Sequence, residues 1–474
     1  MKLKLTNPTK SFLAAGCVLV AGAGLLNTAH AQSADALIDK LVQKGILTVK
    51  EANDLREDSD KGFNQAYQAK TGMPDWVTSM KFSGDFRGRF EQNYTDNKAN
   101  VFPTGPGTFG PAEDRGRWRY RVRFGVTASL VDDFEVGLRL ASGNPFSSFG
   151  GNPVSANTDL SDGSSRKFIW VDAAYAKWTP IHTGPWLAGA TLGKMDNPFQ
   201  LSPMVFDPDI QLEGAAIQAA YQTDKHVLKF NGGAFVLDEF NQPSTANPAA
   251  SHDPYLFGAQ LLLESKWTPK IETALGISAF SITSKENLGT GTAPNNNDGN
   301  TRDDLTGLLV NNYNPIVGSA AFTYKLTSFP LYTGEFPIKF AGEYMDNPGA
   351  AKQNVGYWAG VTLGKSGHKG TWDISYKWQR LEADAWYDEF PDDDFGAFYQ
   401  QGSAGGGFIS AANPKGAGFR GGTNVKGHMI KANFSFTDSM TLSVTYYLAE
   451  LINPNPVGSI STSGHFMVDL MWKF

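Results

Sequence analysis

The sequence predicts an all-β protein, a transmembrane antiparallel β-barrel of about sixteen strands that follows a short α-helical N-terminal segment. Three observations support this fold class. Apolar and polar side chains alternate along many short segments, and the connections between these segments are alternately short and long. The last segment, residues 465–474, is apolar on one face because side chains alternate at period 2, and that face carries Phe466, Val468, Leu470, Trp472 and Phe474.

Residues 1–31 have the layout of a secretory signal peptide. A stretch with three lysines precedes an apolar run over residues 12–26, and Ala29 and Ala31 form a small-residue cleavage site. A lipoprotein signal at Cys17 is the alternative, but it would leave a very short apolar region. We therefore expect cleavage after Ala31, export, and three parts: a signal peptide over 1–31, a helical periplasmic segment and linker over 32–76, and a barrel over 77–474.

Composition narrows the function classes. Removal of residues 1–31 leaves 38 basic and 47 acidic residues, hence a formal charge of −9, and no cysteine. Disulfide frameworks and cysteine metal sites are thereby excluded, and nucleic acid is a poor partner for so acidic a chain. Aromatic residues make up 12% of the chain, yet no apolar run after residue 31 approaches the ~20 residues that a membrane helix needs.

Residues 32–61 show helical periodicity. Leu37, Ile38 and Leu41 recur at helical spacing, and Thr48 with Glu51 forms a capping box that opens a second helix. Two short helices cannot form a core alone. We expect them to oligomerise, to pack on the barrel, or to contact the cell wall.

From about residue 80 the periodicity changes to 2. Phe82, Phe86 and Phe90 lie on one face of a predicted strand, opposite Arg87 and Arg89. Sixteen such segments start near residues 80, 117, 133, 167, 186, 213, 227, 255, 270, 313, 336, 355, 370, 425, 439 and 463. A soluble β-sandwich could show the same alternation, but it would seldom place Trp and Tyr at strand ends.

The connections follow the parity of the segments. Tight turns follow the even-numbered segments, for example at 131–132, 223–225 and 437–438. The connections after the odd-numbered segments are mostly long and polar, with residues 347–354 as the short exception. This asymmetry is typical of outer-membrane barrels and places both mature termini in the periplasm. Because sixteen to eighteen strands leave an aqueous channel, we expect passive passage of small hydrophilic solutes.

Three blocks, residues 192–214, 380–395 and 422–428, resemble the putative porin family of Gram-negative bacteria. The resemblance implies a channel in the bacterial outer membrane, with outer-membrane lipid around it and no cofactor. It also implies a homotrimer, for which Gly84 and Gly88 on the lipid face would allow close approach. The aromatic end of the chain, Trp472 and Phe474, resembles the signal that the barrel-assembly machinery recognises. A Gly-rich insert at 402–422 departs from the family pattern and leaves the conformation of the 382–424 loop open.

The most specific chemical feature is a ladder of arginines. Arg117, Arg119, Arg121 and Arg123 alternate with Trp118, Tyr120, Val122 and Phe124, and a charge facing mid-bilayer would cost about 2–4 kcal/mol, so the arginines should face the lumen. Arg87, Arg89 and Arg139 should join this pore-lining basic wall. The loop after the fifth strand offers opposite charge through Asp196, Asp207, Asp209 and Glu213. We hypothesise that this loop folds into the barrel and faces the arginines as an acidic constriction.

The alternative for the arginines is structural: they would pair with Asp85, Glu91 and Glu135 on adjacent strands. Other candidates have weaker support. Carboxylates at 388–394 could bind calcium but match no EF-hand, so no metal site is predicted. His465 and Ser463 invite comparison with outer-membrane phospholipases, but His465 falls on the lumen face, and no catalytic residue or enzyme activity is predicted.

Two further functions stay open. Trp358, predicted on the lumen face, could stack a sugar, so a substrate-specific anion or carbohydrate channel is one alternative. A structural or adhesive surface barrel that grips the cell wall through residues 32–61 is the other.

Overall fold

The structure is a computed structural model that describes residues 73–95, 101–105, 108–111, 114–147, 150–239, 252–288, 299–303, 308–396, 422–453 and 461–474. Residues from Trp76 to Phe474 form one compact unit. The predicted signal peptide over 1–31 and the predicted helices over 32–61 lie outside the described residues. Within the described ranges, no helix is long and apolar enough to cross a membrane.

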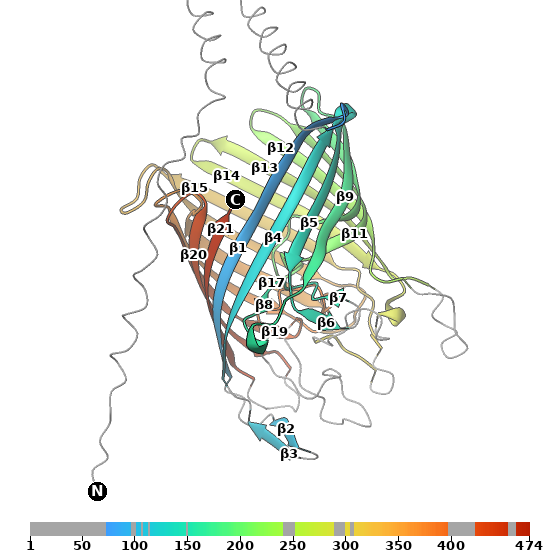
Figure 1. Ribbon diagram of the computed structural model, residues 1–474, viewed down its shortest axis with the longest axis vertical. Coiled ribbons are helices and arrows are strands. Elements are labelled where there is room, and N and C mark those ends of the chain that lie inside the picture. The colour runs from blue at the N-terminus through green and yellow to red at the C-terminus, as the bar shows by residue number, and fades with distance from the viewer. Residues whose placement is uncertain are drawn as a thin grey trace, which may run out of the picture. The chain divides into compact units, whose positions relative to one another are not determined.

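Sixteen long antiparallel strands form a closed barrel, which confirms the predicted fold class (Figure 1). The barrel closes because β1 pairs with both β4 and the last strand, β21. Every strand begins within three residues of its predicted start. The strands are β1 (Val77–Thr95), β4 (Arg115–Leu130), β5 (Phe134–Ser142), β9 (Ile169–Ile181), β10 (Trp186–Asp196), β11 (Gln211–Gln222), β12 (His226–Val236), β13 (Tyr255–Thr268), β14 (Ile271–Ile282), β15 (Ile316–Leu326), β16 (Phe336–Asp346), β17 (Val355–Gly364), β18 (Trp372–Leu381), β19 (Val425–Ser435), β20 (Met440–Leu451) and β21 (Ser463–Lys473).

Short strands and 3₁₀ turns lie in the connections between the long strands. Four of the short strands form two small hairpins outside the barrel sheet, β2 with β3 and β6 with β7, and β8 pairs with β4 next to the barrel wall. A 3₁₀ turn at Val131–Asp133 joins β4 to β5, with Asp132 and Asp133 at positive φ, which short polar side chains tolerate. The short elements are β2 (Val101–Gly105), β3 (Thr108–Pro111), β6 (Pro145–Ser147), β7 (Gly150–Gly151), β8 (Thr158–Asp159), η1 (Val131–Asp133), η2 (Asp162–Ser164) and η3 (Lys285–Asn287).

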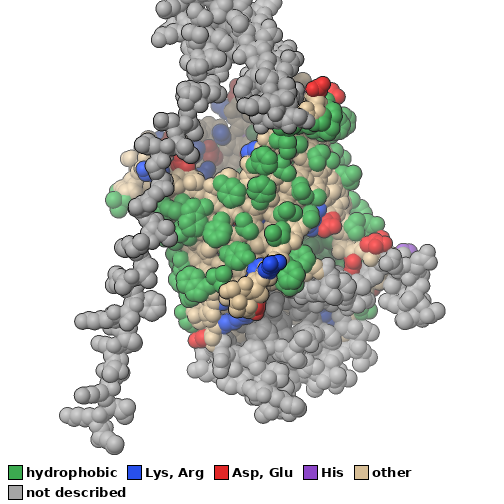
Figure 2. All heavy atoms as spheres, in the orientation of Figure 1, with side chains coloured by type: hydrophobic (Ala, Val, Ile, Leu, Met, Phe, Trp, Pro, Cys, Tyr) green, Lys and Arg blue, Asp and Glu red, His purple; other side chains and the backbone are tan. Residues whose placement is uncertain are grey.

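The outside of the barrel is apolar. Figure 2 shows hydrophobic side chains spread over the outer face of the strands with few charges among them. Trp118 is 62% exposed and Leu192 is 66% exposed, whereas the neighbouring Arg119 is buried. The alternation along each strand therefore separates an apolar outer face from a polar lumen, as a membrane-spanning barrel requires.

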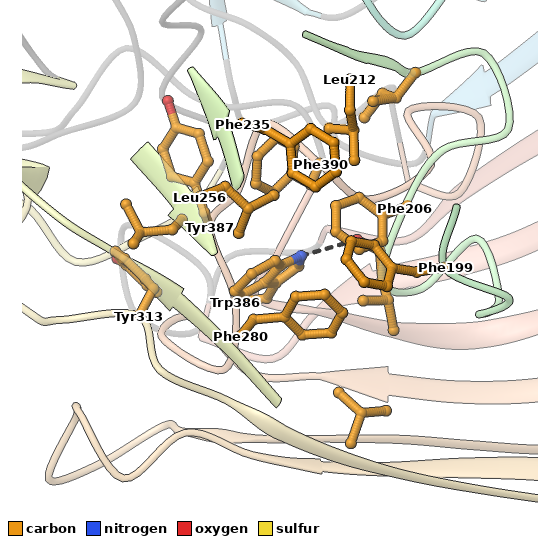
Figure 3. Close-up of a cluster of buried hydrophobic side chains, with 14 of the residues drawn as sticks. Phe199, Phe206, Leu212, Phe235, Leu256, Phe280, Tyr313, Trp386, Tyr387 and Phe390 are labelled. Atoms are coloured by element: carbon orange, nitrogen blue, oxygen red, sulfur yellow. Dashed lines mark hydrogen bonds between the residues drawn. The ribbon is translucent and has the colours of Figure 1, made fainter. Parts of the chain in front are cut away.

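An apolar core fills part of the lumen (Figure 3). Phe235 and Phe280 reach inward from β12 and β14, and Phe199 meets both rings edge-on at 6.0 and 5.0 Å between centroids. Trp386 is fully buried beside Phe206, at 5.9 Å between ring centroids. Phe199 and Phe206 belong to the connection after β10, and Trp386 belongs to the connection after β18. Both connections are thus packed inside the barrel by apolar burial.

The chain's last residue closes the sheet against Gly84. The amide of Gly84 donates to the carbonyl of Phe474 at 2.8 Å, and the amide of Phe474 donates to the carbonyl of Gly84 at 3.1 Å. A Cβ at position 84 would lie 2.5 Å from the Phe474 ring. Phe474 of the same chain therefore fills the space beside Gly84. From the sequence alone, a second copy of the barrel is expected to approach at this position.

Candidate functional site

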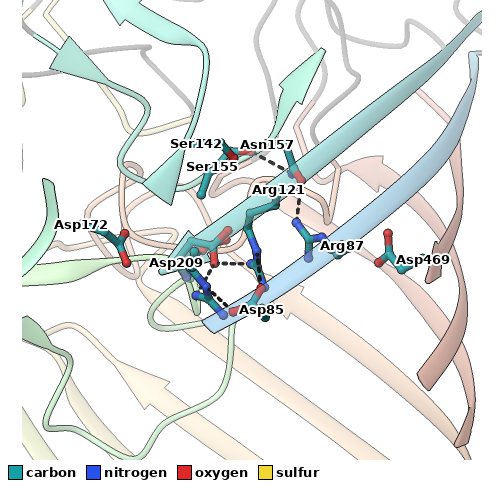
Figure 4. Close-up of polar contacts among 12 residues, drawn as sticks. Asp85, Arg87, Arg121, Ser142, Ser155, Asn157, Asp172, Asp209 and Asp469 are labelled. Atoms are coloured by element: carbon teal, nitrogen blue, oxygen red, sulfur yellow. Dashed lines mark hydrogen bonds and ion pairs between the residues drawn. The ribbon is translucent and has the colours of Figure 1, made fainter. Parts of the chain in front are cut away.

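The predicted arginines lie together on two paired strands. We call Arg87 and Arg89 on β1, with Arg117, Arg119, Arg121 and Arg123 on β4, the arginine wall. Arg87 is the register partner of Arg121, and Arg89 is the partner of Arg119. The alternate residues of β4 face outward, so all of these guanidinium groups lie on the lumen side of the barrel. Figure 4 shows part of this wall, with Arg87 and Arg121 on adjacent strands.

Carboxylates of β1 and β8 pair with Arg117 and Arg119. Glu91 is fully buried, forms an ion pair with Arg117, and lies 3.5 Å from the Nη1 of Arg119. Arg119 also lies 2.9 Å from Asp159 of β8. Glu91 therefore pairs with these arginines, as the structural alternative for the arginine ladder expects. Glu135 departs from it, because Glu135 accepts a hydrogen bond from Tyr175 instead.

Arg121 and Arg123 pair with carboxylates from β1 and from the connection after β10. Arg121 and Arg123 bind Asp85 on β1, at 3.0 and 2.7 Å. The same two arginines lie 2.9 and 3.6 Å from Asp209 of the connection after β10. Asp209 thus stands where the constriction hypothesis requires an acidic group, opposite the arginine wall.

Arg87 and Arg139 differ in their partners. Arg139 on β5 pairs with Asp172, and its Nη2 lies 2.5 Å from Asp196, the last residue of β10. Arg87 donates to the amide oxygen of Asn157 at 2.6 Å. Within the described part of the chain, no carboxylate lies within ion-pair distance of Arg87, and its Nε is buried without a hydrogen-bond partner.

Two connections cross the lumen, and we call them inner loop 1 (residues 197–210) and inner loop 2 (residues 382–396). The indole N–H of Trp386 donates to the carbonyl of Val205 at 2.8 Å. Two backbone bonds join the same loops, from Asp207 to Phe390 at 2.7 Å and from Asp392 to Pro203 at 2.9 Å. Inner loop 1 therefore folds into the barrel and is held there by inner loop 2, a contact that the sequence did not predict.

The four acidic residues assigned to the constriction lie in different places. Asp209 contacts the arginine wall, and Asp196 contacts Arg139. Glu213 does not belong to the loop: it lies in β11, faces outward because its neighbour Leu212 is in the apolar core, and pairs with Lys194 at 2.6 Å. The assignment of Glu213 to an acidic constriction is corrected accordingly.

Asp207 joins a carboxylate cluster with Asp392 and Asp393, in which one oxygen of each lies within 4.8 Å of the others. Burial and the neighbouring Asp394 raise the pKa of Asp392 to about 6. Burial and the charge of Asp392 likewise raise the pKa of Asp207 well above its ordinary value. Burial opposes ionisation of Asp394 as well, but Arg89, at 3.0 Å, and His465 hold its pKa below the usual range.

A cavity of about 660 Å³ lies between the arginine wall, the two inner loops and the opposite barrel wall. Its charged lining includes residues that the sequence analysis did not single out as a group: Lys339 on β16, Lys377 on β18, Lys431 on β19 and Lys473 on β21. The period-2 pattern places Lys377 and Lys473 on lumen faces, but no local motif connects lysines on separate strands.

The weaker candidates are distributed as follows. His465 lies inside the barrel, with Nδ1 3.1 Å from the carbonyl oxygen of Asp394, and not on the lipid side that the phospholipase comparison requires. Asp388 forms a fully buried ion pair with Arg302 at 3.3 Å. The indole N–H of Trp358 donates to Glu343 at 2.9 Å, and the ring lines the cavity.

Among solved structures, this chain is distantly similar to porins. A triple mutant of the Rhodopseudomonas blastica porin is 10% identical, with a TM-score of 0.37. Another variant of the Rhodopseudomonas blastica porin is 11% identical, with a TM-score of 0.39. A structure described as "Asymmetric conductivity of engineered proteins" is 10% identical, with a TM-score of 0.38. Each alignment covers 84% of this chain and 100% of the other chain.

The comparison with curated proteins finds no match. The family model described as "Putative porin" matches residues 64–305, more than half of the 474-residue chain. This match agrees with the closed sixteen-stranded barrel and with its charged lumen. The chain belongs to the putative porin family and is a porin-type channel.

Proposed function

We propose that this protein is an outer-membrane porin whose water-filled lumen lets small hydrophilic solutes and ions diffuse passively. The observation that carries the proposal is the cavity of about 660 Å³ inside the barrel, lined by arginines, lysines and aspartates. Sixteen strands enclose more space than their own side chains fill. Charged groups in such a lumen keep it hydrated and act on passing ions.

The two inner loops fill part of the lumen and so narrow the passage. The apolar core around Trp386 occupies the side of the lumen formed by strands such as β12, β13 and β14. The charged cavity occupies the remaining space beside β1 and β4. A solute would therefore pass through this cavity, with the arginine wall and its partner Asp209 on one side and the lysines of the opposite barrel wall on the other.

The cellular setting is proposed on the same basis. The signal peptide over 1–31 and the even strand count support an outer-membrane location with both mature termini in the periplasm. We further propose assembly as a homotrimer, contact of residues 32–61 with the cell wall, and recognition of Trp472 and Phe474 by the barrel-assembly machinery. The exposed ring of Phe474, 64% accessible at the edge of β1, is compatible with such recognition.

Planar-bilayer recording tests the proposal. We expect stepwise, ohmic conductance from the purified full-length protein, and liposomes that contain it should swell in isotonic solutions of small sugars and amino acids. A protein that inserts but passes neither ions nor sugars would support the structural or adhesive alternative. An esterase assay on the same detergent-solubilised sample addresses the enzyme alternative, for which we expect no turnover.

A further inference from the structure

The cations that line the cavity fall into two sets that differ in their partners. On the arginine wall, every arginine except Arg87 has a carboxylate within 4.0 Å. The lysines of the opposite wall have none among the residues that the structure describes. Because a close ion pair cancels much of the field of its members, lysines without such a close partner keep more of their field, although Asp392 and Glu343 act on Lys377 at longer range.

The register of five strands places two of these lysines in one row. Lys339 pairs with Thr362, Thr362 with Ser375, Ser375 with Lys431, and Lys431 with Thr445. We call these five residues the lysine belt. All five line the cavity, and each therefore presents an ammonium or a hydroxyl group to it.

The geometry of the belt favours a ligand that two lysines share. Three strand spacings separate Lys339 from Lys431, which is about 14 Å along the wall. The wall is concave toward the lumen, so the long side chains converge as they leave it, and Thr362 and Ser375 fill the interval with hydroxyl donors. Ammonium and hydroxyl donors that are not engaged in an ion pair are suited to oxyanions.

Lys377 extends the positive surface without competing for the ligand. It lies two residues from Ser375 on the same face of β18, is buried, and donates to Gln379 at 2.8 Å. Its ammonium lies 5.3 Å from the ring centroid of Phe395, which also covers it from inner loop 2. Lys377 is thus held by Gln379 and Phe395, whereas the ammonium groups of Lys339 and Lys431 have no hydrogen bond or ion pair among the described residues.

We propose that the lysine belt is a binding site for small multivalent oxyanions, of the dicarboxylate or phosphate kind, and that it makes the channel anion-selective. This inference rests on the proposed channel function and specifies its preferred solutes. It also assigns selectivity to residues other than the arginine wall. Except for Arg87, the arginines of that wall are already paired with carboxylates, namely Asp85, Glu91, Asp159, Asp209, Asp394 and Asp469.

The test is a reversal-potential measurement in a potassium chloride gradient, with the full-length protein in planar bilayers. The parent should favour chloride, and the double variant Lys339→Gln with Lys431→Gln should reduce the chloride-to-potassium permeability ratio by about threefold, the size expected for two unit charges screened by water. The matched control is Lys229→Gln with Lys325→Gln. Those lumen lysines are paired with Glu264 and Glu272, each at 2.6 Å.

Oxyanion binding is measured in the same bilayers by adding succinate or inorganic phosphate at fixed chloride. Either anion should lower the chloride current through the parent and through the control, and the effect should be lost in the belt variant. The anion that acts identifies whether carboxylates or phosphates are the preferred ligands.

The outcomes separate the two proposals. A parent protein that forms no channel overturns the proposed function and this inference with it. A conducting channel that favours potassium, that neither anion inhibits, or whose belt variant matches the control overturns the inference alone. Circular dichroism of each variant in detergent establishes that the barrel has formed before the bilayers are compared.

Discussion

Four residues of the arginine wall line the same cavity as the lysine belt, but the charges of the two walls have different surroundings. Arg117 and Arg119 share the fully buried Glu91, and Arg121 shares Asp85 and Asp209 with its neighbour Arg123. Lys339 and Lys431 have only hydroxyl-bearing register partners. One wall is a network of ion pairs, and the other is a row of hydroxyl groups with two lysines that have no carboxylate within 4.0 Å among the described residues.

This difference separates stability from selectivity. Buried paired charges are costly to break, because removal of one partner leaves the other desolvated and alone. Solvated unpaired charges contribute little to folding but attract counter-ions from solution. The arginine wall should therefore act mainly on the barrel's stability, and the lysine belt mainly on which solutes enter.

The largest expected effect is on the arginine wall. Glu91→Ala leaves two arginines of β4 without their shared buried carboxylate, and we expect the free energy of unfolding to fall by about 3–5 kcal/mol. Lys431→Gln should change it by no more than about 0.5 kcal/mol. Equilibrium urea unfolding of both variants in lipid vesicles gives the comparison. Equal losses in the two variants would show that ion pairing does not distinguish the walls.

The second prediction concerns ion preference on the arginine wall itself. Arg119→Ala with Arg121→Ala leaves Glu91, Asp85 and Asp209 with fewer cations, so the lumen becomes more negative and the reversal potential should move toward that of potassium. We expect this shift to come with a loss of stability, which the lysine-belt variant should not show. An unchanged reversal potential would mean that solutes do not pass along the arginine wall.

Much of the barrel follows from local pattern. Period-2 alternation and the parity of the connections predict sixteen strands because each strand must separate lipid from water on its own, residue by residue. The arginine wall follows for the same reason, since four of its arginines lie on one strand. Asp209 was assigned to an acidic loop opposite that wall, and it lies against Arg121.

The rest of the site depends on contacts between distant segments. Lys339 and Lys431 are 92 residues apart in the sequence and become neighbours in a row only through the register of β16 to β19. The contact of Trp386 with Val205 depends on how two loops pack in an apolar core. Neither arrangement has a sequence signal, because each lysine or aromatic alone is an ordinary lumen residue.

The third prediction uses pH to change the charge that faces both walls. The pKa of Asp392, raised to about 6 by burial and by Asp394, means that this carboxyl group is neutral in the folded protein below that pH. The folded state therefore loses stability as the pH rises through about 6, and the cluster with Asp207 and Asp393 gains negative charge. We expect chloride preference to be higher at pH 5 than at pH 8.

Asp392→Asn supplies the control for that titration. Its cluster keeps Asp207 and Asp393, and Arg89 and Lys377 remain as the nearby cations, but the group that titrates near pH 6 is gone. The chloride preference of the variant should change less between pH 5 and pH 8 than that of the parent in the bilayer assay, because Asp207, whose pKa burial also raises, is the remaining group of the cluster with a raised pKa. A full pH response in the variant would assign the titration to another group.

The smallest expected effect is also the sharpest test of the comparison, because Arg87 belongs to the arginine wall by position and resembles the lysine belt by its partners. Among the described residues its guanidinium donates one hydrogen bond, to Asn157 at 2.6 Å, and it lines the cavity. Arg87→Gln should lower chloride preference by roughly half as much as the double lysine variant, since one charge is lost instead of two. It should cost only about 1 kcal/mol of stability, the net value of a single hydrogen bond. If the loss instead matches that of Glu91→Ala, then position on the wall determines the role of a cation, and ion pairing does not.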